Sequence, residues 1–181
     1  MKRRNDFTEI INQRGYTVAV EVGVGWGGFS ELLLSSCSGI TLYSVDPWSP
    51  QGAEYRPESK EYTEARLSKY GERSKIMVMT SLSAAALIPD NSVDFVYIDG
   101  DHGGEAVSAD CASWWPKIRS GGIMAGHDYQ ESRSDLRGAV DAHAASVGQK
   151  VQVTDGEMKW EDSGKEQGEE ASSPSWWYEK Q

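Results

Sequence analysis

The side chains best suited to chemistry in this sequence are acids and histidines that directly follow short apolar runs. Asp99 and His102 follow one such run within IDGDH, and His127 and Asp128 follow another within GGIMAGHDY. Carboxylates and imidazoles are the groups that most often bind metals or move protons near neutral pH. Their placement therefore predicts a catalytic or metal-binding cluster.

A glycine-rich run, EVGVGWGGFS, lies between an apolar stretch and a helical pattern. Glycines at this spacing match G-x-G-x-x-G, where they allow a sharp turn and a close approach of a nucleotide cofactor to the backbone. Glu21 precedes the turn, and its carboxylate would repel a pyrophosphate but attract the sulfonium and ammonium groups of S-adenosylmethionine. The alternative is that Glu21 caps the next helix or pairs with a lysine. The predicted cofactor contacts from this run are Glu21, Gly23, Gly25, Trp26 and Gly27.

Further cofactor contacts are predicted after the second and third apolar runs. Asp46 is placed to accept hydrogen bonds from both ribose hydroxyls, a feature that NAD enzymes share. Pro47 and Trp48 are predicted to lie against an adenine face, with a core position as the alternative for the tryptophan. Ser81 and Leu82 are predicted to reach the adenine edge.

The second cluster suggests a metal-assisted proton transfer. Asp99, His127 and Asp128 would offer oxygen and nitrogen ligands to Mg²⁺ or another divalent cation, and Asp99 would also face the cofactor. A metal would lower the pKa of a bound substrate hydroxyl, and His102 could remove its proton, so His102, Asp99 and His127 are the predicted catalytic residues. The alternative is that the acids cap the helix beginning near Gly104 while His127 and Asp128 satisfy loop backbone.

The elements that must position these residues alternate along the chain. Strands are predicted at 17–22, 41–46, 75–79, 93–98, 123–127 and 150–153, and helices at 57–70, 104–118 and 134–147. The helix at 104–118 is supported by an apolar stripe of Val107, Cys111, Trp114 and Ile118. This alternation predicts an α/β fold with a parallel sheet covered by helices on both faces, and ligands in such sheets bind at the carboxyl ends of the strands.

Composition narrows the classes of function. The 181 residues carry a formal net charge of −10, which fits one domain and argues against nucleic acid or an anionic membrane as the partner. Two distant cysteines exclude a disulfide framework and a thiolate zinc site. Because no signal peptide or spanning segment is apparent, we expect a cytoplasmic protein that acts on a small molecule.

The combination of EVGVG, VDPW and IDGDH, in that order, resembles class I S-adenosylmethionine-dependent methyltransferases over residues 17–153. The I-D-G-D-H run followed by GGIMAGHDY is similar to a small-molecule O-methyltransferase branch. The resemblance implies a Rossmann-like three-layer sandwich whose seven-stranded sheet has the order 3-2-1-4-5-7-6, with the last strand antiparallel. It also implies that Glu21 and the glycine turn hold the methionine part of the cofactor, Asp46 the ribose, and the residues after the third strand the adenine.

The resemblance also bears on the metal and on domain organisation. In metal-assisted relatives an Asp-Asn pair occupies the place of His127-Asp128, so this chain departs from the pattern. We expect an extension at 1–16, a single domain at 17–181 with an acidic loop at about 154–174, and a monomer or homodimer. The alternatives are an NAD(P)-binding oxidoreductase, for which no Tyr-x-x-x-Lys pair is apparent, and a non-catalytic S-adenosylmethionine-binding domain.

Overall fold

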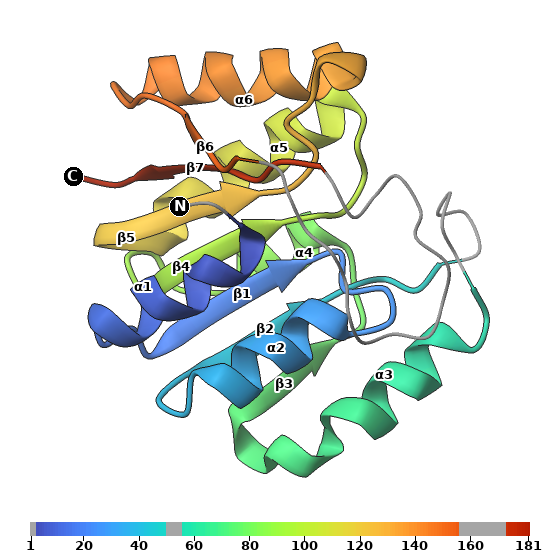
Figure 1. The fold of residues 1–181 in the computed structure, drawn as a ribbon. Coiled ribbons are helices and arrows are strands. Elements are labelled where there is room, and N and C mark those ends of the chain that lie inside the picture. The colour runs from blue at the N-terminus through green and yellow to red at the C-terminus, as the bar shows by residue number, and fades with distance from the viewer. Residues whose placement is uncertain (1–2, 50–55, 156–172) are drawn as a thin grey trace.

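A computed structural model describes residues 3–49, 56–155 and 173–181 of the chain. One seven-stranded sheet runs through its centre in the order β3-β2-β1-β4-β5-β7-β6 (Figure 1). Its strands are β1 (Val18–Val22), β2 (Thr41–Val45), β3 (Ser74–Met77), β4 (Val93–Ile98), β5 (Ile118–Gly126), β6 (Gln152–Val153) and β7 (Trp176–Glu179). The predicted order of strands is confirmed.

Strand direction brings one set of strand ends together. Neighbouring strands from β3 through β5 are parallel, whereas β7 runs antiparallel to both β5 and β6. The predicted antiparallel last strand is therefore confirmed as β7. Because all five parallel strands end at the same edge, the loops after them form one continuous rim.

Helices cover both faces of the sheet, as Figure 1 shows. They are α1 (Phe7–Gln13), α2 (Gly28–Ser36), α3 (Ser59–Leu67), α4 (Ser81–Leu87), α5 (Gly104–Trp114) and α6 (Ser134–Ser146). Apolar residues of α1, α2 and α3 share one core cluster with inward-facing strand residues, and those of α4, α5 and α6 share the other. This arrangement confirms the three-layer sandwich.

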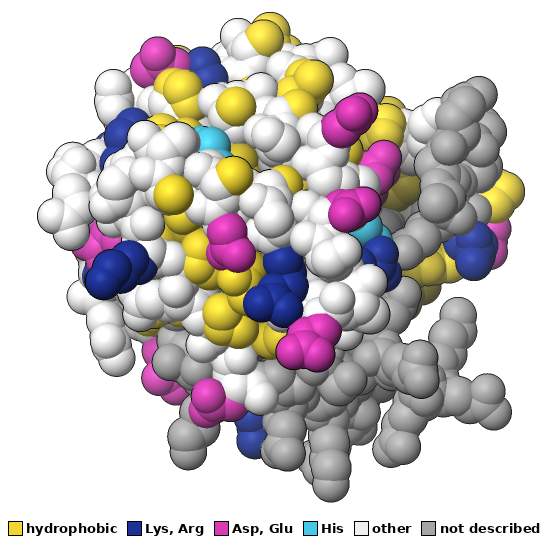
Figure 2. Space-filling model, turned by 90° about the horizontal axis from the view of Figure 1, so that it is seen from above, with side chains coloured by type: hydrophobic (Ala, Val, Ile, Leu, Met, Phe, Trp, Pro, Cys, Tyr) yellow, Lys and Arg dark blue, Asp and Glu magenta, His cyan; other side chains and the backbone are white. Residues whose placement is uncertain are grey.

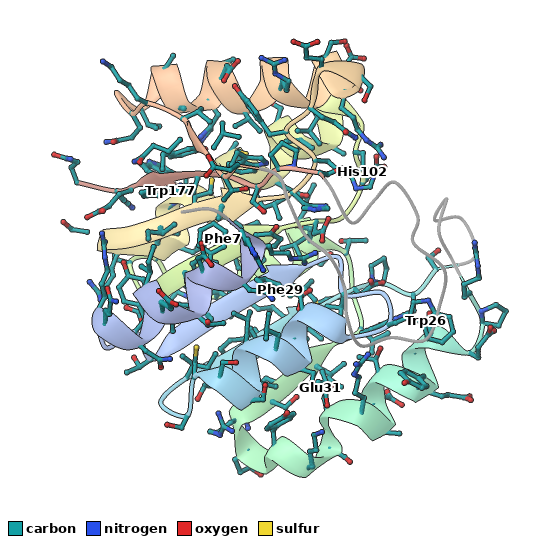
Figure 3. All side chains as sticks on the ribbon, viewed as in Figure 1. Phe7, Trp26, Phe29, Glu31, His102 and Trp177 are labelled. Carbon is teal, nitrogen blue, oxygen red and sulfur yellow. The ribbon has the colours of Figure 1, made fainter. Side chains whose placement is uncertain are left out.

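The residues predicted as an N-terminal extension pack onto the sheet. A short 3-10 helix over Arg4–Asp6 leads into α1. Phe7 and Ile11, four positions apart on α1, are 0% and 1% exposed. Figure 3 shows Phe7 and Phe29 reaching the same face of the sheet from α1 and α2. The segment before β1 thus covers the sheet next to the strand ends.

Two predicted helices are shorter in the structure. The helix predicted at 104–118 ends at Trp114, a 3-10 turn follows over Trp115–Lys117, and Ile118 begins β5. The placement of Ile118 on a helical stripe was wrong because Pro116 lacks the N–H that a continuing helix needs. The helix predicted at 57–70 gives way to a 3-10 segment after Leu67, which ends beyond Gly71.

Other predictions are met in part. β3 begins one residue before the predicted 75–79 and ends two residues earlier, and β6 covers half of 150–153. Most of the predicted acidic loop lies outside the described residues. No helix in the described part of the chain is long and apolar enough to cross a membrane.

Candidate active site

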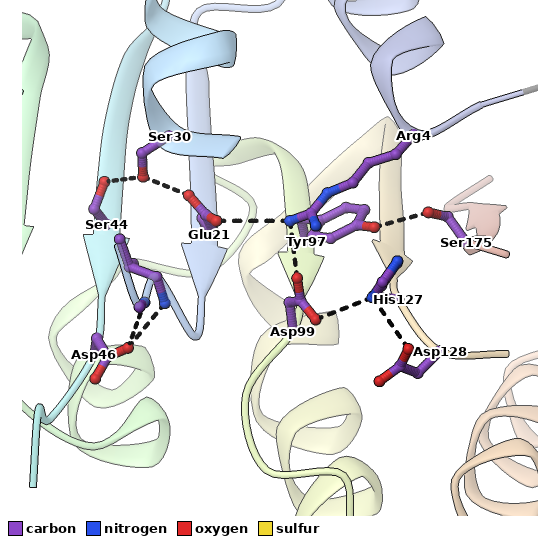
Figure 4. A network of polar contacts seen from close by, with 12 residues as sticks. Arg4, Glu21, Ser30, Ser44, Asp46, Tyr97, Asp99, His127, Asp128 and Ser175 are labelled. Carbon is purple, nitrogen blue, oxygen red and sulfur yellow. Dashed lines mark hydrogen bonds and ion pairs between the residues drawn. The ribbon is translucent and has the colours of Figure 1, made fainter. Parts of the chain in front are cut away.

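Alternation along the strands gathers the polar side chains of the site on one face of the sheet. Glu21 on β1 lies opposite Tyr97 on β4, and both point to the face that α1 and α2 cover. Asp99 and His127 continue the same alternation just beyond the ends of β4 and β5. Figure 4 shows Glu21, Asp99, His127 and Asp128 linked in one network through Arg4, with Tyr97 beside it and bonded to Ser175.

Arg4 occupies the centre of this network, and no motif in the sequence pointed to it. Its Nη2 lies 2.8 Å from Oδ2 of Asp99 and 3.8 Å from Oε1 of Glu21. The guanidinium carbon lies 4.0 Å from the ring centre of Phe29 and 4.6 Å from that of Tyr97. Two carboxylates and two aromatic faces thus surround one permanent cation.

Glu21 is buried, with 1% of its surface exposed. It accepts a hydrogen bond from the Ser30 hydroxyl, which also bonds with that of Ser44 across 2.8 Å. Burial raises the pKa of Glu21 to about 8, although Arg4 and Ser30 act in the opposite direction. The alternative in which Glu21 pairs with a basic residue is thus present in the structure, with an arginine as its partner. Contact between Glu21 and a cofactor stays a prediction.

The glycine turn follows β1 with backbone conformations that suit glycine. Gly23 has φ +84°, and a Cβ there would lie 2.0 Å from the carbonyl oxygen of Asp99. The backbone of Gly23 therefore packs directly against the loop after β4, with no room for a side chain. Gly25 is exposed, with φ +53° and open space where a Cβ would be.

Asp46 joins the end of β2 to the glycine turn. Its Oδ2 accepts hydrogen bonds from the backbone N–H groups of Val24 and Gly25, at 2.9 and 3.0 Å. Its Oδ1 accepts one from the N–H of Trp48, whose indole N–H donates to the Gly25 carbonyl. Trp48 is 8% exposed and thus occupies the core position that was its alternative, whereas Pro47 is exposed.

Two of the predicted adenine and cofactor contacts lie at the surface. Trp26 is 36% exposed and meets Tyr62 of α3 edge to face, with ring centres 5.5 Å apart. Trp26 and His102 both lie at the edge where the parallel strands end (Figure 3). Leu82 is 49% exposed, and the Ser81 hydroxyl accepts a hydrogen bond from the Trp114 indole at 2.9 Å. The hydroxyl of Ser81 is thus already engaged within the protein.

The second predicted cluster is assembled. Nδ1 of His127 lies 3.5 Å from Oδ1 of Asp99 and 3.2 Å from Oδ1 of Asp128. Nε2 of His102 lies 3.1 Å from Oδ2 of Asp128 and 4.0 Å from Oδ1 of Asp99. Nε of Arg133 lies 3.6 Å from Oδ2 of Asp128. The carboxylates therefore alternate with cationic or titratable nitrogen groups.

This alternation shifts the pKa of the two carboxyl groups and the two imidazoles toward their charged forms. Burial alone would raise the pKa of Asp99, but Arg4 and the two imidazoles hold it below its ordinary value. Burial would lower the pKa of His127, yet hydrogen bonds with Asp128 and Asp99 raise it to about 9. The pKa of His102 is raised as well, by the carboxylates of Asp99 and Asp128. His127 is thus protonated near neutral pH, and the two carboxylates favour the protonated form of His102.

The donor set does not fit a divalent cation. Among the described residues, no group of three or more His, Cys, Asp or Glu side chains is arranged to hold a metal ion. Asp99 already faces the Arg4 guanidinium, and Asp128 faces His102 and Arg133, so a further cation would meet positive neighbours. The prediction of a metal at Asp99, His127 and Asp128 finds no support in this geometry.

The same geometry is compatible with a nucleoside cofactor. The turn exposes Gly25, whose N–H and carbonyl are bonded to Asp46 and Trp48, and acids follow β2 and β4 on either side of the turn. Arg4 carries a buried Nε–H that meets no acceptor within the described chain. An exposed turn, flanking carboxylates and an unused donor together suit a ligand that carries both charges and hydroxyl groups.

Comparison with known proteins identifies the family. The sequence of residues 20–129, more than half of the chain, matches the family described as "Methyltransferase domain". The chain belongs to this methyltransferase family. The matched region holds every predicted site residue, from Glu21 to Asp128.

Solved structures share the fold of this methyltransferase domain. A Clostridium thermocellum protein assigned as an rRNA methylase has a TM-score of 0.68 at 14% identity, covering 99% of this chain and 98% of that one. A Streptococcus mutans protein assigned as a methyltransferase, in complex with S-adenosylhomocysteine (SAH), has a TM-score of 0.68 at 11% identity and covers 100% and 99%. The Bacillus cereus O-methyltransferase in complex with SAH has a TM-score of 0.66 at 12% identity and covers 97% and 80%.

A curated relative is an uncharacterized protein, y4gI, from Sinorhizobium fredii. It is 29% identical over 117 residues, which are 60% of this chain and 13% of that protein. The methyltransferase domain thus spans a small part of that much longer relative, which adds no information about substrate.

Proposed function

We propose that this domain transfers a methyl group from S-adenosylmethionine to an oxygen atom of a small-molecule acceptor. The observation that carries the proposal is the convergence of Glu21 and Asp99 on Arg4, next to a glycine turn whose Gly23 packs against Asp99. The solved relatives from Streptococcus mutans and Bacillus cereus hold SAH in the same fold, which supports the choice of cofactor. When bound, S-adenosylmethionine supplies an electrophilic methyl group.

The protein's own residues would position the reactants. Asp46 already fixes the glycine turn, and its carboxylate is the group proposed to accept the ribose hydroxyls. Asp99 is held in its ionised form by Arg4 and is proposed to face the cofactor's ammonium group. Such positioning contributes on the order of 7–11 kcal/mol to a bimolecular transfer.

The two histidines are suited to different roles. His127 is bracketed by Asp99 and Asp128, and its pKa of about 9 keeps it cationic near neutral pH. His102 is more exposed, with 21% of its side chain accessible against 12% for His127, and its Nε2 lies 3.1 Å from Oδ2 of Asp128. His102 is therefore the proposed base for the acceptor hydroxyl, acting once it has lost its proton. No step is assigned to a metal ion.

A small acceptor is favoured over nucleic acid by charge. The net charge of −10 opposes the approach of a phosphate backbone. On the face over α6, acidic, basic and hydrophobic side chains of the described residues are interspersed (Figure 2). Because one solved relative is assigned as an rRNA methylase, RNA belongs among the acceptors to be tested.

The experiment has a binding arm and a transfer arm. SAH should raise the melting temperature and NAD⁺ should not, because only a ligand of the native state stabilises it. Methyl-labelled S-adenosylmethionine should label a hydroxylated small molecule and not total RNA. His102→Gln should lower kcat by roughly a hundredfold while leaving the Kd of SAH unchanged. Protection by NAD⁺ alone, or label found in RNA, would contradict the proposal.

A further inference from the structure

Arg4 is a buried cation to which the proposed chemistry assigns no contact with the cofactor. Its side chain is 12% exposed, and its Nη2 forms ion pairs with Asp99 and Glu21. Its Nε–H is buried and meets no hydrogen-bond acceptor in the described part of the chain. Buried donors in native proteins nearly always have a partner, so this one indicates an acceptor that a ligand supplies.

The position of Arg4 restricts which ligand group that acceptor belongs to. Glu21, its more distant partner, lies two residues before Gly23, and the backbone of Gly23 packs against that of Asp99. Arg4 therefore stands beside the glycine turn, where the amino-acid end of the cofactor is proposed to lie. Figure 4 shows its side chain reaching between Glu21 and Asp99.

The charges around Arg4 also match that end of the cofactor. The Arg4 guanidinium and the Asp99 carboxylate stand side by side, with Nη2 and Oδ2 2.8 Å apart. An α-amino acid presents the opposite pair, an ammonium and a carboxylate on one carbon. A zwitterion can thus meet both protein charges at once, with its ammonium toward the acid and its carboxylate toward the guanidinium.

We propose that Arg4 binds the carboxylate of the cofactor's methionine moiety through its Nε–H, and so completes the cofactor site from outside the glycine motif. The inference rests on the proposed function, because it presumes that S-adenosylmethionine is the ligand. The opposite reading has Arg4 filling the place of the cofactor's ammonium, in which case its removal would strengthen binding. The two interpretations predict opposite changes in the affinity for SAH when Arg4 is replaced.

The test compares two ligands that differ only in the carboxylate. SAH and its decarboxylated analogue share the adenosine, the thioether and the amine, so any disturbance of Asp99 or Glu21 affects both alike. By calorimetry, the wild type should bind SAH roughly ten- to a hundredfold more tightly than the analogue, the range for a hydrogen bond to a charged group. In Arg4→Gln this preference should disappear through weaker binding of SAH, while the Kd of the analogue changes little.

Two further variants keep the test decisive. Arg4→Lys retains a cation beside Asp99 but lacks the Nε–H, so it should lose part of the preference even where Arg4→Gln proves too unstable to purify. Arg14 lies on the same N-terminal segment as Arg4 but pairs with Glu179 of β7, away from the site. Arg14→Gln should therefore keep the full preference for SAH over the analogue.

Three results would overturn the inference: an unchanged ratio of the two Kd values in Arg4→Gln, an equal loss for both ligands, or tighter binding of SAH. Failure of the wild type to bind either ligand is a separate outcome. It would refute the proposed function itself, and the role of Arg4 would fall with it.

Discussion

Asp110 is a carboxyl group that the fold buries away from the candidate site. It lies on α5 with 6% of its surface exposed, and burial raises its pKa to about 6, which the Ser81 hydroxyl offsets only in part. The folded state therefore binds the proton more tightly than the unfolded chain does. Burying the ionised carboxylate of Asp110 lowers the free energy of unfolding. This loss is absent at low pH, grows as the pH rises from about 4 to 6, and is complete above that range.

Asp110→Asn should therefore stabilise the protein at pH 7. The gain in the free energy of unfolding should be about 1–3 kcal/mol, since one pKa unit corresponds to about 1.4 kcal/mol. Urea unfolding at pH 7 and at pH 4 measures it, and the gain should vanish at the lower pH. Glu105→Gln, on the exposed side of the same helix, is the matched control for loss of one charge. An equal gain at both pH values would show that the gain does not come from the ionisation of Asp110.

The sequence predicted that the acids and histidines that follow β4 and β5 would lie close together, and the structure confirms this. Asp99, His102, His127 and Asp128 meet because the ends of parallel strands share one edge. Arg4 could not be assigned in this way, because its place depends on where the chain before β1 is anchored. The apolar pair at Phe7 and Ile11 is the signal that could have located a packed helix there.

α1 holds the Arg4 segment in place chiefly through Phe7. Its ring is fully buried and meets those of Phe95 and Tyr97, with centres 5.3 and 5.8 Å away. Phe7→Ala should lower the free energy of unfolding by roughly 3–5 kcal/mol. It should also weaken SAH binding, because the residues before α1 lose their anchor.

Chemical unfolding and calorimetry on the same samples test this coupling between α1 and the site. Gln13→Ala, on the exposed side of α1, should change neither quantity. Full stability of Phe7→Ala would mean that α1 contributes nothing to the core. Normal SAH binding by a destabilised Phe7→Ala would separate the core role of α1 from the site.

Element boundaries were predicted less well than the elements themselves. The apolar stripe continued through Ile118 because β5 begins where the helical spacing would place its next buried residue. Only Pro116, which cannot supply a helical N–H, distinguished the two interpretations. Local periodicity thus located an inward-facing residue correctly but assigned it to the wrong element.

We expect the polar residues that stabilise the fold and those that bind the cofactor to lie at opposite edges of the sheet. At the amino edge, Asp94 accepts hydrogen bonds from the backbone N–H groups of Thr17 and Val18, and it pairs with Arg119. This carboxylate ties together the starts of β1, β4 and β5. Asp94→Ala should lower the free energy of unfolding by roughly 2–4 kcal/mol, because two backbone N–H groups and Arg119 lose a charged acceptor.

The Kd of SAH should be unchanged in folded Asp94→Ala, since the candidate site occupies the carboxyl edge. Asp90→Ala, which loses an exposed pair with Lys117, is the control and should change neither property appreciably. A higher Kd of SAH in Asp94→Ala would show that the two edges of the sheet are coupled through the strands.

The order of strands followed from the resemblance and could not have come from periodicity. Alternation and apolar runs identify strands, but which strands pair depends on contacts between distant segments. The insertion of β7 between β5 and β6 shows this, since the last strand in sequence is not the last in space.

That position of β7 also means that the sheet is completed only after every residue of the candidate site has been synthesised. Until residues 176–179 have left the ribosome, β5 keeps an open edge and Gly126 lacks the Trp176 ring that packs against it. A nascent chain in that state exposes unpaired backbone to other polypeptides. Premature termination just upstream of β7 would therefore yield a product prone to aggregate, even though every residue of the candidate site had already been made.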